Sequence, residues 1–388
     1  MMEKVYLDYA ATTPVDSRVL EDMKPYFSKE FGNASSLYSM GQQARLAMEN
    51  SRKKIANIIN AEPNEIVFTS GGTESDNLAL IGVALANKEK GNHIITSKIE
   101  HKAIMETCEF LEKQEFEITY LDVDKYGIVD LNQLKKSIRK ETILVSIMHA
   151  NNEIGTLEPI EEIGKICREK GIYFHTDAVQ SFCKIPIDVK KMKIDMLSAS
   201  SHKIYGPKGV GLLYVRKGVK IEPLLHGGGH ESGRRSGTEN VAGIVGFAKA
   251  CEIASKEMGK EARRLSKMRN RLVEGILKIP NSYLSGHPEK RLPGNTNFRF
   301  DFIEGEALIL RLDMLGIEAS TGSACSSRDL KASHVLTSIG LSPKQAHGSL
   351  RITMGRYTRE KDIDYVIKSV PKVVNELRKI SPFKKGWE

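Results

Sequence analysis

The chain has 388 residues, of which 40% are hydrophobic and 28% are charged, and its formal net charge is +9. This length is too great for one small core, so we expect two domains or a large domain with a smaller companion. No apolar stretch approaches the ~20 residues of a membrane helix. The N-terminal sequence MMEKVYLDYAATT lacks the basic and apolar regions of a secretory signal, so we expect a cytoplasmic protein without membrane contact.

Charge and cysteine content exclude further classes of protein. Basic and acidic residues are mixed along the chain, which indicates a solvated basic surface and no direct nucleic-acid binding. A surface for an acidic protein partner or a phosphate-bearing cofactor is the alternative. The cysteines form no CxxC pair, so we expect neither a disulfide framework nor a metal site; they are Cys108, Cys167, Cys183, Cys251 and Cys325.

Short β-rich runs alternate with helical patterns over roughly the first half of the chain. The runs cover residues 65–70, 93–97, 116–123, 142–150, 171–177, 195–200 and 209–216, and helices are predicted between them at 73–86, 103–113 and 160–170. This alternation predicts an α/β domain with a mostly parallel seven-stranded sheet flanked by helices.

A long charged helical pattern over residues 242–279 is suited to connecting two domains. The elements predicted after it are a strand at 295–302, a helix at 304–316, a loop at 320–327, a strand at 349–354 and a helix at 360–380. These elements predict a smaller α+β domain. We place the large domain at residues 16–262 and the small domain at residues 1–15 and 263–388.

Polar residues gather where the predicted strands stop, and ligands of open α/β sheets bind outside the carboxyl ends of the strands. Glycines open a helix in TSGGTES (69–75), where backbone N–H groups and the helix dipole favour a phosphate; a helix capped by Thr73 is the alternative. In HTDAVQS (175–181), a buried Asp177 needs a cationic partner such as a pyridinium nitrogen. Taken alone, a capping or surface role for Asp177 is favoured.

A lysine follows another strand end in SASSHKIYGPKGVG (198–211). Once desolvated, Lys203 can lose its proton and form a Schiff base, while Ser200 and His202 can donate to a phosphate. Lys208, within the Pro-Lys-Gly sequence of the same run, is interpreted as a turn lysine.

Two residues of the C-terminal part are candidates for substrate chemistry. Cys325 lies among Gly, Ser and Ala in STGSACSSRD (320–329), where we expect an accessible, mobile loop and a nucleophilic thiol. An incidental surface cysteine is the alternative. Arg351 enters a short strand and suits the carboxylate of an amino-acid substrate, although a surface salt bridge fits the same pattern.

Together, these segments resemble the cysteine desulfurases, members of the class V aminotransferase group of pyridoxal-phosphate enzymes of fold type I. The resemblance runs nearly end to end through YLDYAATTP (6–14), GNASSLYSMG (32–41), TSGGTESDN (69–77), EH (100–101), MHANNEIG (148–155), HTDAVQS (175–181), SSHKIYGPKG (200–209), RRSGTEN (234–240), TGSACSS (321–327) and LRITMGRYT (350–358). The loop around Cys325 resembles the branch that serves iron–sulfur assembly. A departure is Leu37-Tyr38, which replaces the more usual residues after the turn at 33–36.

The resemblance implies pyridoxal 5'-phosphate as cofactor and a role for each matching residue. Lys203 holds the cofactor and Asp177 keeps its ring nitrogen protonated. Gln180 and His101 contact the ring, and His101 also moves protons. The residues implied for the phosphate are Gly72, Thr73, Ser200 and His202, together with Thr238 from the neighbouring subunit of a homodimer. Asn152 and Arg351 bind the substrate carboxylate or the ring edge.

The resemblance also implies the reaction. L-Cysteine becomes L-alanine while the Cys325 thiolate takes the sulfur as a persulfide, which passes to an acceptor protein of iron–sulfur assembly or tRNA thiolation. A selenocysteine lyase shares the scaffold and is the nearest alternative. An aminotransferase or a kynureninase-type lyase needs no loop cysteine. A non-catalytic sulfur-relay or scaffold partner is a further alternative, against which the intact Lys203, Asp177, His101 and Cys325 argue.

Overall fold

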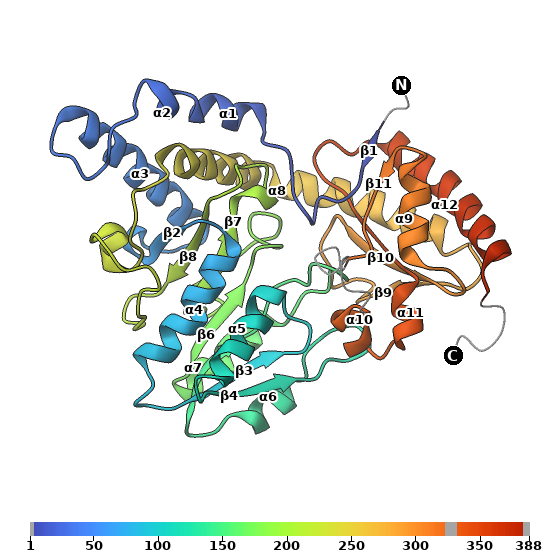
Figure 1. The fold of residues 1–388 in the computed structure, drawn as a ribbon, viewed down its shortest axis with the longest axis horizontal. Coiled ribbons are helices and arrows are strands. Elements are labelled where there is room, and N and C mark those ends of the chain that lie inside the picture. The colour runs from blue at the N-terminus through green and yellow to red at the C-terminus, as the bar shows by residue number, and fades with distance from the viewer. Residues whose placement is uncertain (1–3, 323–331, 383–388) are drawn as a thin grey trace.

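A computed structural model describes residues 4–322 and 332–382 of the chain. Figure 1 shows a large lobe built around one sheet and a smaller lobe beside it, with one long helix running from the first into the second. No helix of the described residues is long and apolar enough to cross a membrane.

The large lobe contains a seven-stranded mixed sheet. In spatial order its strands are β2 (Ile66–Thr69), β8 (Gly211–Val215), β7 (Met196–Ser200), β6 (Tyr173–Asp177), β5 (Thr142–Ser146), β3 (His93–Ser97) and β4 (Glu117–Leu121). β8 pairs antiparallel with both β2 and β7, and all other neighbouring strands pair parallel. The predicted mostly parallel sheet is therefore confirmed. The antiparallel strand β8 lies between β2 and β7.

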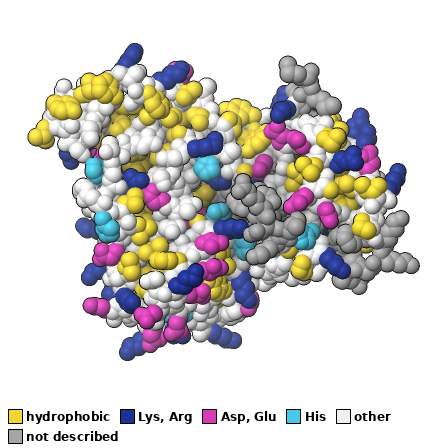
Figure 2. Space-filling view, viewed as in Figure 1, with side chains coloured by type: hydrophobic (Ala, Val, Ile, Leu, Met, Phe, Trp, Pro, Cys, Tyr) yellow, Lys and Arg dark blue, Asp and Glu magenta, His cyan; other side chains and the backbone are white. Residues whose placement is uncertain are grey.

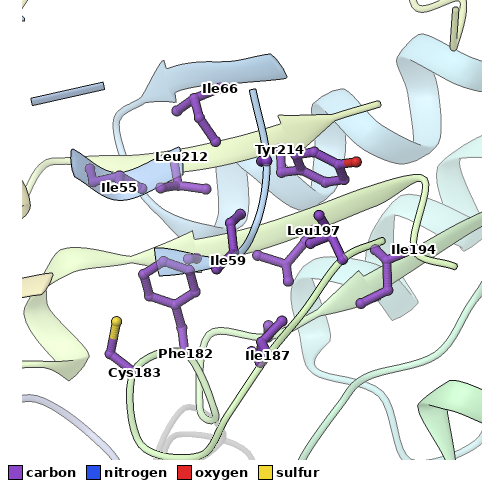
Figure 3. Packing of buried hydrophobic residues seen from close by; sticks show 14 of the residues in the cluster. Ile55, Ile59, Ile66, Phe182, Cys183, Ile187, Ile194, Leu197, Leu212 and Tyr214 are labelled. Atoms are coloured by element: carbon purple, nitrogen blue, oxygen red, sulfur yellow. The ribbon is translucent and has the colours of Figure 1, made fainter. Parts of the chain in front are cut away.

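Helices cover both faces of this sheet (Figure 1). The helices of the large lobe are α1 (Ser17–Met23), α2 (Pro25–Ser28), α3 (Ser39–Ile58), α4 (Gly72–Ala86), α5 (Lys102–Glu112), α6 (Leu131–Ser137) and α7 (Ile160–Lys170). Successive strand residues point to opposite faces, so Leu212 joins the core beneath α3, whereas Leu213 joins the core beneath α4. Figure 3 shows the first of these cores, in which Leu212 lies near Ile55.

The helix α8 (Val241–Ile276) links the two lobes. Its 36 residues span about 54 Å. Its N-terminal half packs in the core of the large lobe as far as Ile253, while the stretch from Met268 to Ile276 packs in the core of the small lobe. The predicted connecting helix is thus present.

The small lobe combines a three-stranded antiparallel sheet with helices. Its strands lie in the order β12 (Ser349–Thr353), β10 (Asn295–Phe300), β9 (Ser282–Ser285), and a separate parallel pair joins β1 (Val5–Tyr6) to β11 (Ile317–Glu318). Its helices are α9 (Gly305–Asp313), α10 (His334–Ser338), α11 (Pro343–His347) and α12 (Glu360–Ile380). Val5 and Leu7 pack in this core, so the N-terminus belongs to the small lobe before the chain crosses to α1. The boundaries at residues 15 and 262 stay a prediction.

Candidate functional site

The site forms where the parallel strands end. Asp177 is the last residue of β6 and pairs with Ser198 of β7, two residues before Ser200 ends that strand. The short 3-10 helix η2 (Ser201–Lys203) follows at once and contains Lys203. On the other side, α4 begins at Gly72, directly after β2 and its turn. The strand ends therefore bring these polar residues to one edge of the sheet, as the sequence predicted.

The N-terminus of α4 is open toward Ser200. The N-cap is Gly71, which offers no side-chain hydrogen bond, so the alternative in which Thr73 caps this helix is wrong. A Cβ placed on Gly72 would lie 2.7 Å from Val179 Cγ2 and 3.8 Å from Ser200 Cβ. Backbone N–H groups of a 15-residue helix point out of this end and favour an anion. The turn thus has the form of a phosphate cradle.

Asp177 is buried at the end of β6, with 5% of its surface exposed. One carboxyl oxygen accepts a hydrogen bond from Val179 N at 2.8 Å. Burial raises the pKa of Asp177, while the charges of His101 and Lys203 oppose that rise. A buried carboxylate is stabilised by a cation held against it, and a protonated pyridine ring supplies one. This environment fits the ring nitrogen of pyridoxal phosphate.

The amine of Lys203 lies against the N-terminal segment. Its Nζ donates to the carbonyl oxygens of Ala10 and Ala11 at 2.6 and 2.7 Å. Gln180 Nε2 donates to the same Ala10 oxygen at 3.0 Å. Two predicted cofactor ligands therefore meet on one backbone carbonyl, which fixes Lys203 relative to Gln180.

Two histidines lie on either side of these groups. His101 is the N-cap of α5, where its Nδ1 accepts from Ala103 N at 3.1 Å, so its Nε2 carries the ring proton. Burial lowers the pKa of His101, and the Asp177 carboxylate opposes that change. Burial and the charge of Lys203 lower the pKa of His202 to about 4. His202 is therefore a neutral imidazole near pH 7, able to donate one hydrogen bond.

Arg351 and Asn152 come together on the small-lobe side of the site. Arg351 is 3% exposed, and its guanidinium donates to the Asn152 carbonyl oxygen at 3.0 Å and to the Gly322 carbonyl oxygen at 3.4 Å. Its Nη2 pairs with Asp8 Oδ1 at 2.7 Å, and its buried Nε has no hydrogen-bond partner. The surface-salt-bridge alternative is wrong, because this guanidinium is buried between two lobes.

Thr238 is not brought to this cluster within one chain. It is exposed and lies beside Gly237 and Arg235 at a separate pocket near Ser70. The preceding segment includes the 3-10 helix η3 (His230–Gly233), where Glu231 pairs with the buried Arg52 at 2.7 Å. Cys325 lies outside the described residues, and the other four cysteines are buried.

Sequence reasoning missed several residues of the site. Asp8, Ala10 and Ala11 belong to a segment that was used only for its resemblance, and a carbonyl oxygen gives no sequence signal. Glu100, which precedes His101, was likewise used only for the resemblance and was given no role. It accepts from Ser97 Oγ and Met148 N, and burial raises the pKa of Glu100 to about 8. An acidic residue three positions after the buried strand β3 was the available signal.

Comparisons with known proteins agree with this geometry. The class-V aminotransferase family matches residues 5–366. Cysteine desulfurase IscS of Dictyoglomus turgidum is 54% identical over 100% of this chain and 99% of its own length. The corresponding protein of Methanosarcina thermophila is 57% identical over 97% of this chain and 94% of its own.

Solved structures give the same result. A NifS-like protein superimposes with a TM-score of 0.91 at 41% identity, covering 97% of this chain and all of its own. The structure called SspA in complex with cysteine has a TM-score of 0.81 at 41% identity, covering 92% of this chain and all of its own. The chain belongs to the class-V aminotransferase family and, within it, to the cysteine desulfurases.

Proposed function

We propose that this chain is a pyridoxal-phosphate-dependent cysteine desulfurase that converts L-cysteine to L-alanine and carries the released sulfur on Cys325. The observation that supports this most is the convergence of buried Asp177, the open N-terminus of α4 and Lys203 at one sheet edge. Relatives that are more than half identical to this chain over nearly its whole length are cysteine desulfurases.

The residues at this edge suit each part of the cofactor. The α4 N-terminus, Thr73, Ser200 and His202 would bind its phosphate, and Asp177 would pair with its ring nitrogen. Gln180 and His101 would contact the ring, and Lys203 would attach it covalently. When bound, pyridoxal phosphate withdraws electrons from the substrate Cα.

Lys203 is positioned to move the Cα proton. Once released from the cofactor, its amine takes this proton, and the Ala10 and Ala11 carbonyl oxygens stabilise the resulting ammonium. His101, whose Nδ1 is engaged by Ala103 N and whose Nε2 carries the ring proton, can return a proton to the substrate. Arg351 and Asn152 orient the substrate carboxylate.

We assign the transfer of sulfur to Cys325 because of the loop sequence around it, STGSACSSRD (320–329). The thiolate of Cys325 attacks the substrate sulfur, so that an S–S bond forms and the substrate C–S bond breaks. The electron pair of the broken bond stays with the substrate Cβ, which takes up a proton, and Cα regains the proton that Lys203 removed. Alanine then leaves, while the enzyme holds a persulfide. A thiol reductant or an acceptor protein then removes this sulfur.

We also infer a homodimer in which Thr238 reaches the phosphate of the other subunit. Thr238 is exposed and lines a pocket with Thr69 and Ser70, and none of Gly72, Thr73 and Ser200 lines that pocket. Large apolar side chains are exposed over α2, α3 and the segment between them, where Figure 2 shows a hydrophobic area; they are Phe27, Phe31, Leu37, Tyr38 and Leu46. Burial of such a patch against a second copy removes apolar area from water.

The test combines colour with product analysis. The purified protein is expected to be yellow and to form alanine and sulfide from cysteine plus reductant. Lys203→Ala should lose the chromophore, and Cys325→Ala should keep the chromophore but form no persulfide. Full activity of Cys325→Ala on cysteine would exclude the persulfide mechanism. If Cys325→Ala retained activity on selenocysteine alone, the enzyme would instead resemble a selenocysteine lyase.

A further inference from the structure

A cavity of about 90 Å³ lies where the two lobes meet. Its walls come from the N-terminal segment, from α8, and from the ends of β10 and β12. Lys203 and Gln180 line it, but none of the other residues assigned to the cofactor or the substrate does. The cavity is therefore a neighbour of the catalytic lysine and not the cofactor site itself.

Two polar groups in its wall have no partner. The Lys184 side chain is partly exposed, and no hydrogen bond or ion pair joins its amine to any residue in the described ranges. Asn295 is 3% exposed, and neither atom of its amide group has a hydrogen-bond partner. Buried polar groups are normally hydrogen-bonded, since each unpaired one costs about 1–3 kcal/mol. The buried Asn295 amide therefore favours a polar occupant, and the charge of Lys184 favours an anionic one.

The remainder of the wall is mostly apolar. Met258, Ala262 and Leu265 of α8 line it, together with Leu292. A cavity of about 150 Å³ holds benzene, so this one suits a smaller molecule of about four or five heavy atoms. An occupant that satisfies Lys184 carries negative charge, and one that satisfies Asn295 also carries a hydrogen-bond acceptor.

We propose that this cavity binds a monocarboxylate of two or three carbons, with its carboxylate on Lys184 and the Asn295 amide and its carbon chain against α8. Acetate and propionate have this chemistry. Because Lys203 shares the cavity wall, an occupied cavity places a carboxylate close to the catalytic amine.

The other titratable groups of the wall are paired or buried. They are Tyr9, Cys183, Tyr205, Lys203, Glu257, Glu261 and Arg356, and Cys183 is buried. Glu257 forms ion pairs with Arg18 and Arg356, and Glu261 with Arg264. Burial raises the pKa of both tyrosines, and Lys203 is bound by two carbonyl oxygens. Lys184 is therefore the group expected to change charge near neutral pH.

The pH dependence follows from this chemistry. Burial, with a contribution from Lys203, lowers the pKa of Lys184 to about 7. Only the protonated amine attracts a carboxylate, so binding takes up a proton when the pH is above about 7. The affinity then falls about tenfold for each pH unit in that range, until the pKa of the occupied site is reached. A guanidinium such as Arg351 gives no such fall, because it stays charged.

The experiment uses the cofactor-loaded dimer with saturating L-alanine, which occupies the substrate site. Acetate and propionate are titrated by calorimetry between about pH 6 and pH 9, a range that spans the lowered pKa of Lys184. Saturable binding that weakens as the pH rises is expected. Acetamide, which is neutral and of similar size, should bind at least about tenfold more weakly at low pH. No saturable carboxylate binding, or binding independent of pH, would overturn the proposal.

Three variants test whether Lys184 and Asn295 bind the carboxylate. Lys184→Met keeps the length of the side chain without its charge and should abolish the pH-dependent binding. Asn295→Leu keeps the volume and should weaken binding by about tenfold. Lys170→Met, at a separate surface groove, is the matched control and should bind as the wild type does. Unchanged binding in a folded, yellow Lys184→Met or Asn295→Leu protein would contradict the assignment. Desulfurase activity is measured in parallel. Activity without carboxylate binding would contradict this site alone, whereas absence of activity would contradict the proposed function.

Discussion

Arg351 shows how one residue depends on a distant segment of the chain. Its guanidinium is held by Asp8, 343 positions away, and by the Asn152 carbonyl oxygen. Asp8 binds the Nη2 of Arg351, and the buried Nε of Arg351 has no hydrogen-bond partner. A carboxylate that approaches Arg351 therefore meets a guanidinium whose orientation is already fixed.

Asp8→Asn tests this positioning at the residue scale. The change weakens the ion pair and lets the guanidinium turn, so KM for cysteine should rise about 10- to 100-fold with a smaller change in kcat, equivalent to about 1.4–2.7 kcal/mol. Steady-state kinetics measure both constants. Asp8→Glu should recover part of the loss. An equal fall in kcat and kcat/KM, with KM unchanged, would show that Asp8 does not act on substrate binding.

At the scale of elements, the ion pair between Arg52 and Glu231 fixes η3 to α3 and β2. Glu231 accepts from both terminal nitrogens of Arg52 at 2.7 Å and from Phe68 N at 2.8 Å. Both Glu231 and the next residue, Ser232, have positive φ, at 48° and 58°. Backbone in this region costs free energy for residues other than glycine, so the ion pair offsets local strain.

Arg52→Met should destabilise this loop. The substitution leaves a buried, unpaired carboxylate and should lower the free energy of unfolding by about 3 kcal/mol or more. If Thr238 binds the cofactor of the other subunit, cofactor affinity should fall as well. Arg271→Met, which removes exposed ion pairs with Glu360 and Asp364, is the control and should cost less than Arg52→Met, about 1 kcal/mol or less for each pair. Denaturant unfolding and cofactor titration measure the two effects.

For the whole molecule, buried histidines couple stability to pH. His149 is 5% exposed and lies 3.0 Å from Ser181 Oγ, and burial lowers the pKa of His149 from 6.5 to about 4. The unfolded chain therefore binds more protons than the folded one between these values. Stability rises with pH across this window and is lost as the pH falls toward 4.

His149→Gln should reduce this acid sensitivity. The glutamine cannot take up a proton, so the loss of unfolding free energy between pH 6.5 and pH 4 should shrink by up to about 3 kcal/mol. The exposed His347 provides the control, and His347→Gln should leave the pH profile unchanged. Urea unfolding at a series of pH values measures the difference. Identical acid profiles for the wild type and His149→Gln would refute the role of His149.

The amino-acid sequence alone determined the α/β class, the ends of β3, β6 and β7, and the chemistry placed there. The runs at 116–123 and 142–150 were predicted too long, since β4 ends at Leu121 and β5 at Ser146. Apolar runs define buried strands. Asp177 and Ser200 end two of them and Lys203 follows shortly after, so chain order is enough to place these residues at one edge. The helices at 160–170 and 360–380 were predicted with the bounds that the structure has, because their apolar periodicity stops where their caps begin.

Only the tertiary structure decided which distant residues meet. The pairing of Asp8 with Arg351, the carbonyl oxygens that hold Lys203, and the cavity beside Lys184 all depend on the N-terminal segment crossing between two lobes. Every residue has a backbone carbonyl group, and a cavity depends on packing, so neither can be predicted from residue types. An ion pair between residues hundreds of positions apart follows no sequence periodicity. Such contacts form because buried charges and donors must find partners wherever the fold brings them together.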